Sequence, residues 1–202
     1  GASTLDMKRF ALCFWEVVPG DTWLPHQSTP TGGLTHSGLQ FVSISREPGG
    51  EFRALAADLK AEGRLGGALS GQPVWGKRGV ACSWMGTLPC SLYMGVVFDN
   101  SIAAIVPHDE KHLTPIWCYC SSDSFLKEVR KINQKTQVAN ATLVKVPFDL
   151  SYWQKVAEEK YPDGLPKPFS SDATQWLFNG HPAVADQPLH VAVARLVGYL
   201  WP

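Results

Sequence analysis

The chain has 202 residues, a length that suits one large domain or two small ones. Hydrophobic residues make up 45% and charged residues 18% of the sequence, which excludes an intrinsically disordered protein. No run approaches the roughly 18 apolar residues of a membrane span, so we expect no membrane partner. The 18 basic and 18 acidic residues balance, which excludes a globally basic nucleic-acid coat but not a local basic patch.

The amino-terminal third gives three indications of regular structure. Residues 10–18 are almost wholly apolar and indicate a buried strand or a short helix. A loop rich in Pro, Gly, Ser and Thr follows over 19–38, and the apolar residues between 39 and 44 then suggest a strand. Apolar residues three and four apart predict an amphipathic helix over 51–62.

The middle of the chain predicts a second loop and then a pair of strands. Residues 73–89 resemble a loop because glycine, proline and polar residues interrupt them. Residues 91–98 and 101–106 indicate two strands joined at Asp99-Asn100 in a hairpin-like turn.

The carboxy-terminal third predicts mainly helices. A capped amphipathic helix is expected over 122–133. Residues 141–146 alternate like a strand, and Asp149 is a candidate N-cap for the helix that follows it. A last helix is predicted from Asp186.

These elements predict an α/β fold of mixed, α+β character: one recognition-like domain with a mixed sheet, flanking helices and long loops. Within it we expect an amino-terminal part at 1–70, a core at 71–148 and a helical segment at 149–202 that is truncated from a longer protein.

The cysteines indicate a cytoplasmic protein with free thiols. Their number is odd and the chain is not small, so a disulfide framework is not expected. The five are Cys13, Cys82, Cys90, Cys118 and Cys120. Cys118 and Cys120 would share one face of a strand, but two thiols alone do not make a tetrahedral zinc site.

Sequence motifs for common chemistries are missing. The chain contains no phosphate-binding loop, no Gly-x-Gly-x-x-Gly and no Gly-x-Ser-x-Gly. His108 and His112 have the spacing of a helical zinc site, and a stand-alone metal-dependent hydrolase is one alternative. However, Asp109 stands where such sites carry Glu, and Pro107 and Pro115 flank the segment. Two exposed loop histidines are therefore the favoured interpretation.

Two groups of basic residues indicate nucleic-acid binding. Residues 125–145 hold five basic residues and one acidic residue, a local charge of +4, with amide side chains among them. Lys and Arg neutralise phosphates, and Asn, Gln and Arg pair with base edges. The second group is Lys77-Arg78, between two glycines and with Trp84 nearby. A solvated helix face and a hairpin with exposed charges are the alternative interpretations.

Several segments of the chain together resemble a family. These are residues 75–80, 85–89, 92–95, 105–113, 116–122, 131–149, 172–182 and 191–202. They resemble the carboxy-terminal target-recognition region of large adenine-specific DNA methyltransferases from bacterial restriction–modification and phage-defence systems. The resemblance covers residues 70–202.

The resemblance implies a partner domain of the same parent chain that binds S-adenosylmethionine and carries an Asn-Pro-Pro-Tyr or similar motif. This chain has no Pro-Pro pair, so it is expected to hold no cofactor, to transfer no methyl group and to read double-stranded DNA. The candidate DNA-binding residues are Lys77, Arg78, Arg130, Gln134, Lys135, Asn140 and Lys145. Among them Arg78, Gln134 and Asn140 are candidate base readers, and the lysines would hold phosphates. A protein-interaction module that docks through the last helix remains a further alternative.

Overall fold

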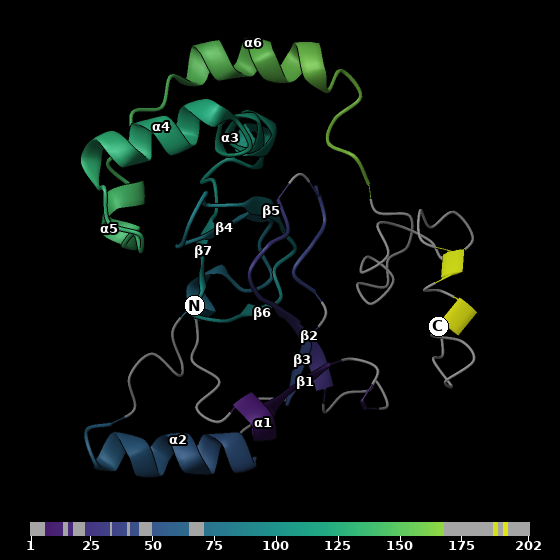
Figure 1. The fold of residues 1–202 in the computed structure, drawn as a ribbon, viewed down its shortest axis with the longest axis vertical. Coiled ribbons are helices and arrows are strands. Elements are labelled where there is room, and N and C mark those ends of the chain that lie inside the picture. Colours follow the sequence, from purple (N-terminus) through teal and green to yellow (C-terminus); the bar gives the residue numbers. More distant parts are fainter. Residues whose placement is uncertain are drawn as a thin grey trace.

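The structure, a computed structural model, describes residues 7–13, 16–17, 23–32, 34–39, 41–44, 50–64, 71–167, 188–189 and 192–193. It has a mixed α/β fold, with two separate sheets and helices gathered at both ends of the long axis (Figure 1). The helix predicted from Asp186 lies outside the described residues, except for 188–189 and 192–193, which are helical.

The first sheet has the strand order β1-β3-β2-β6. Its strands are β1 (Ala11–Cys13), β2 (Trp23–Gln27), β3 (Phe41–Ile44) and β6 (Val97–Phe98). Strand β3 pairs antiparallel with both β1 and β2, whereas β2 pairs parallel with β6. The short helix α1 (Met7–Phe10) precedes this sheet, and α2 (Glu51–Ala61) follows β3.

Helix α2 is joined to the amino terminus of the described chain by an aromatic contact. The rings of Phe10 and Phe52 meet edge to face with their centroids 5.3 Å apart, and both side chains are buried. This contact explains why the apolar stripe of α2 begins at Phe52.

The second sheet has the order β5-β4-β7, and both pairings are antiparallel. Its strands are β4 (Gly79–Ser83), β5 (Cys90–Tyr93) and β7 (Ile102–Ile105). Every residue of the central strand β4 is buried, so this strand forms the floor of the main core.

Helix α3 (Leu113–Cys120) covers the second sheet, and further helices gather around α3 at the opposite end of the molecule from α2 (Figure 1). The other helices at this end are η2 (Glu110–His112), α4 (Asp123–Ile132), α5 (Asn140–Leu143) and α6 (Leu150–Lys160). A separate short helix, η1 (Gln72–Val74), precedes β4. Helix α3 lies against β4, and α6 packs on α3. The Trp117 indole Nε1 donates a hydrogen bond of 3.1 Å to the Tyr161 hydroxyl, which connects α3 to the end of α6.

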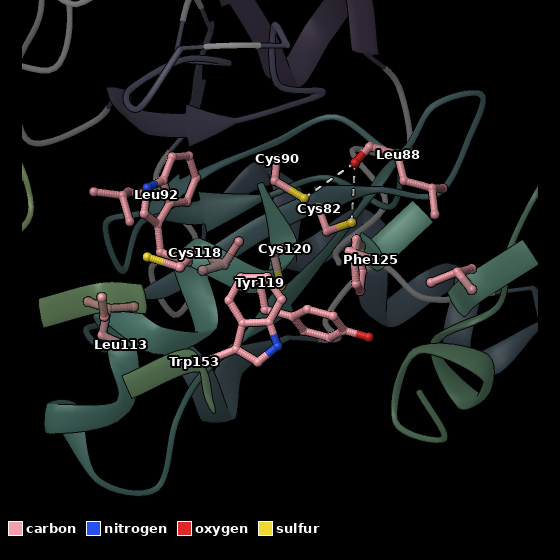
Figure 2. Packing of buried hydrophobic residues seen from close by; sticks show 14 of the residues in the cluster. Cys82, Leu88, Cys90, Leu92, Leu113, Cys118, Tyr119, Cys120, Phe125 and Trp153 are labelled. Carbon is pink, nitrogen blue, oxygen red and sulfur yellow. Dashed lines mark hydrogen bonds between the residues drawn. The ribbon is translucent and has the colours of Figure 1, made fainter. Parts of the chain in front are cut away.

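Three free thiols meet where α3 covers the sheet (Figure 2). Cys82 of β4 lies directly opposite Cys90 of β5, and both thiols donate to the carbonyl of Leu88, at 3.8 and 3.3 Å. A hydrogen bond with Cys82, followed by burial, raises the pKa of Cys90 well above its ordinary value. Burial, followed by the proximity of Cys82, does the same for the thiol of Cys120. Because thiolates are the reactive form, these side chains act as small apolar core residues.

A buried amide links the two sheets. The Nε2 group of Gln27, at the end of β2, donates to the carbonyls of Ser37 and Leu92 and to the Ser91 hydroxyl, at 3.1, 2.9 and 3.0 Å. Within the first sheet, the parallel pairing of β2 with β6 also joins the chain before residue 70 to the chain after it. The predicted boundary at residue 70 is therefore crossed by both a sheet pairing and a buried hydrogen-bond network.

The local helix predictions are confirmed. The helix expected over 51–62 is α2, the one expected over 122–133 is α4, and the strand expected between 39 and 44 is β3. Asp149 caps α6, because its carboxylate accepts the backbone N–H of Tyr152 at 3.0 Å.

The hairpin predicted around Asp99-Asn100 is wrong. Strand β6 pairs with β2 and strand β7 pairs with β4, so the two strands belong to different sheets. The turn carries the chain from one sheet to the other, and the carboxylate of Asp99 stabilises it by accepting the backbone N–H of Ser101 at 2.8 Å.

The strand predicted over 141–146 is also wrong, because α5 occupies its first half. The described strands offer this segment no pairing partner. Instead α5 packs on α4, and the Thr142 hydroxyl accepts a hydrogen bond of 3.2 Å from the amide of Asn133. Val144, which the alternating pattern would bury, is 84% exposed.

Both segments predicted as loops contain a strand. Strand β2 lies within 19–38, and the buried strand β4 lies within 73–89. A strand buried on both faces has no polar–apolar alternation, which is why the pattern of β4 was missed. Cys118 and Cys120 lie on helix α3 and not on a strand.

Candidate nucleic-acid interface

The connection between α4 and α5 forms one wall of a surface pocket of about 590 Å³. Trp84, directly after β4, contributes to the opposite wall. The lining residues are Trp84, Asn133, Lys135, Gln137, Val138, Ala139, Asn140 and Ala141. The pocket thus combines an indole and small apolar side chains with three carboxamides and one lysine.

Backbone hydrogen bonds hold the α4–α5 connection against the segment that follows β4. The Val138 N–H donates to the Trp84 carbonyl at 2.9 Å, and Met85 forms an antiparallel bridge with Gln137. Val138 itself is fully buried. The pocket wall is therefore anchored to the folded core through Val138.

The side chain of Arg130 also connects the α4–α5 connection to the segment after β4. Its guanidinium donates to the carbonyl of Gly86 at 2.6 Å and to the carbonyl of Lys135. Hydrogen bonds from an ionised donor are among the stronger ones in proteins. Of the predicted DNA-binding residues, Arg130 thus has a visible structural role, which is to hold the pocket wall.

The three carboxamides of the pocket differ in their bonding. The Asn133 amide is used internally: its Nδ2 donates to Thr142, and its Oδ1 accepts the Lys135 N–H at 2.9 Å. The exposed side chains of Gln137 and Asn140 make no hydrogen bond within the described part of the chain. Gln134, a predicted base reader, is exposed but does not line the pocket.

The basic residues of this region also fall into two classes. Lys131 is paired with Glu128 at 2.6 Å, and Arg130 is bound to backbone carbonyls. Lys127, Lys135 and Lys145 are exposed and form no ion pair with any described residue. These three cations therefore remain open to a ligand, and Lys135 lines the pocket.

Lys77 and Arg78 lie at the other end of β4. Arg78 is directly before the first residue of the strand and Trp84 is directly after the last one. Six extended residues span about 20 Å. The structure therefore does not bring the two basic groups into one narrow cleft, and Trp84 belongs to the pocket and not to the Lys77-Arg78 group.

Arg78 lies close enough to His36 to affect its titration. Burial, and then the positive charge of Arg78, lower the pKa of His36 below its ordinary value. His36 lies in the segment that follows β2, beside the Thr35 carbonyl that accepts the Leu92 N–H of β5 at 2.8 Å. Arg78 thus faces the amino-terminal part of the chain.

The two histidines of the metal-site alternative lie in and beside η2. His108 is exposed, and His112 is the last residue of that short helix, directly before α3. Among the described residues, no group of three or more His, Cys, Asp or Glu side chains is placed to hold a metal ion.

Sequence reasoning counted Gln137 among the polar residues of the basic run, but it placed Trp84 beside Lys77-Arg78 and so did not bring the two into one site. Gln137 stands in the same polar run as Gln134, and only the bridge to Met85 distinguishes them. Trp84 is more than fifty residues away in sequence, so no local pattern could connect it to this run.

The chain matches no protein-family model, and a search of curated proteins found no significant similarity. None of the helices in the described part of the chain combines the length and the apolar character that crossing a bilayer requires.

Proposed function

We propose that this chain is the DNA target-recognition part of an adenine-specific DNA methyltransferase of a restriction–modification or phage-defence system. In this proposal a separate domain of the parent protein binds S-adenosylmethionine and modifies the base, and the present chain reads double-stranded DNA. The observation that carries the proposal is the fixed pocket between Trp84 and the α4–α5 connection, with free amides in its wall and free lysines beside it.

The chemistry of the pocket supports DNA as the ligand. Lys135 in the wall and Lys145 after α5 are unpaired among the described residues and exposed, as phosphate contacts must be. Carboxamides carry a donor and an acceptor side by side, which is the arrangement that base edges present. The backbone bond of Val138 and the guanidinium of Arg130 hold the backbone of the α4–α5 connection in place before any ligand arrives, which lowers the entropic cost of binding.

The separation of the two basic groups determines how a duplex would lie. About 20 Å along β4 equals the length of roughly six base pairs at 3.4 Å each. A duplex that contacts both Lys77-Arg78 and the pocket must therefore cover at least this length of DNA. A cytoplasmic location is part of the proposal, and five free thiols are consistent with a reducing compartment.

Salt-dependent binding tests the proposal. The affinity of the full chain for a duplex is measured by fluorescence anisotropy between 50 and 200 mM salt. Each phosphate contact contributes about 0.9 to the slope of log affinity against log salt. Lys135→Ala with Lys145→Ala is therefore expected to lower the slope by roughly 1.8.

A matched pair of lysines provides the control. Lys155→Ala with Lys160→Ala removes the same charge from exposed positions of α6 that do not line the pocket. This variant should keep the original slope. Absence of duplex binding at 50 mM salt, or an equal loss of slope in both double variants, would contradict the proposed function.

A further inference from the structure

Two of the three carboxamides in the pocket wall are available to a ligand, and one is not. Asn133 uses both its amide nitrogen and its amide oxygen inside the protein, where it connects α4 to α5. Gln137 and Asn140 line the same pocket, are exposed, and make no side-chain hydrogen bond with the described residues. The fold therefore separates a structural amide from two free amides only a few residues apart.

The backbones that carry the free amides are held in place. Gln137 is bridged to Met85, and the next residue, Val138, is bonded to the Trp84 carbonyl at 2.9 Å. Asn140 begins α5, where its carbonyl accepts the Val144 N–H at 3.3 Å. A reading side chain needs this kind of support, because recognition depends on donors and acceptors placed to within a fraction of an ångström.

The donor–acceptor pattern of a carboxamide selects among bases. In the major groove adenine presents an acceptor at N7 and a donor at N6, which match the amide nitrogen and oxygen of Asn or Gln. Guanine presents two acceptors there and is matched by Arg or Lys instead. In the described structure the guanidinium of Arg130 is bound to backbone carbonyls, and the pocket wall contains one lysine, Lys135, and no arginine.

We propose that Gln137 and Asn140 read adenine in the recognised DNA sequence through its N7 and N6 groups, while Lys135 holds the neighbouring phosphate. This inference rests on the proposed function and makes it specific, since it names the base and the residues that select it. It also assigns Gln134 no part in reading, because that side chain lies outside the pocket.

The test compares sequence preference among variants of the full chain. A preferred duplex is selected from a randomised pool by the unaltered protein. Its affinity is then measured against an unrelated duplex at one salt concentration. Gln137→Ala and Asn140→Ala are each expected to reduce the ratio of specific to non-specific affinity by about 5- to 150-fold. The affinity for the unrelated duplex and the salt slope should not change.

Two controls accompany these variants. Gln134→Ala removes an exposed amide of the same chemistry in the same connection and should leave the ratio unchanged. In the preferred duplex, 7-deazaadenine lacks the N7 acceptor. This replacement should weaken binding of the duplex by the unaltered protein. It should weaken binding less in the variant, Gln137→Ala or Asn140→Ala, whose missing amide is the one that contacts N7. Thermal melting of each variant confirms that it is folded.

The outcomes separate this inference from the proposed function. A preferred duplex that is bound equally well by the unaltered protein and by both pocket variants would overturn the inference and leave DNA recognition standing. A preferred duplex without adenine, or a loss in Gln134→Ala as large as that in Gln137→Ala, would overturn it as well. A chain that binds no duplex would overturn both.

Discussion

Replacing Val129 with alanine tests whether α4 is packed as the structure shows. Val129 lies on the inward face of α4 and is fully buried. Loss of two methyl groups costs about 1.6 kcal/mol of transfer free energy. A void of roughly 40 Å³ adds about 1 kcal/mol if its surroundings do not collapse. The better helix propensity of alanine offsets about 0.5 kcal/mol. We therefore expect the free energy of unfolding to fall by about 2 kcal/mol, which lowers Tm by roughly 4–8 °C.

The measurement is urea-induced unfolding of the full chain, followed by tryptophan fluorescence. Ile132→Ala on the same helix is the control, because it removes more carbon atoms from a side chain that is 44% exposed. It should cost less than about 1 kcal/mol. If Val129→Ala costs no more than Ile132→Ala, α4 does not pack on the core as described. The pocket wall that continues from α4 would then lose its support.

Three further predictions concern pH, backbone conformation and capping. The thiol pKa values of Cys90 and Cys120 are raised in the folded state. The free energy of unfolding should therefore be constant between about pH 7 and 8 and fall as the pH rises above the unfolded thiol pKa of about 8.5. Urea titrations between pH 7 and 10 measure this. Gly95→Ala should lower the free energy of unfolding by more than about 2 kcal/mol, since Gly95 has φ +82° and an added Cβ would lie 2.9 Å from a backbone carbon of Gly76. Gly86 has φ +62° but open space around an added Cβ, so Gly86→Ala should lower it by about 1 kcal/mol. Thermal melting of the two variants measures the difference. Asp149→Ala should cost about 1 kcal/mol and Asp149→Ser much less, as judged by urea unfolding, because serine also caps helices.

The sequence predicted part of the candidate site. The basic and amide-rich run from Phe125 to Lys145 was visible in the sequence, and Lys135 and Asn140 do line the pocket. The run could not show which amides are free, because Asn133 is committed by a contact with α5, an element that the alternating pattern predicted as a strand. Nor could it show that Lys77 lies at the far end of β4.

The sequence by itself determined the elements whose signals are local. Helices α2, α4 and α6 follow from apolar residues at helical spacing and, for α6, from the capping carboxylate of Asp149, and these signals lie within a dozen residues. Only the tertiary structure decided that β6 and β7 belong to different sheets, that β4 is the buried centre of one of them, and that Trp84 closes a pocket with the α4–α5 connection. The physical reason is that strand pairing and pocket walls depend on hydrogen bonds and burial between segments far apart in the chain, and no contiguous stretch of sequence contains both partners.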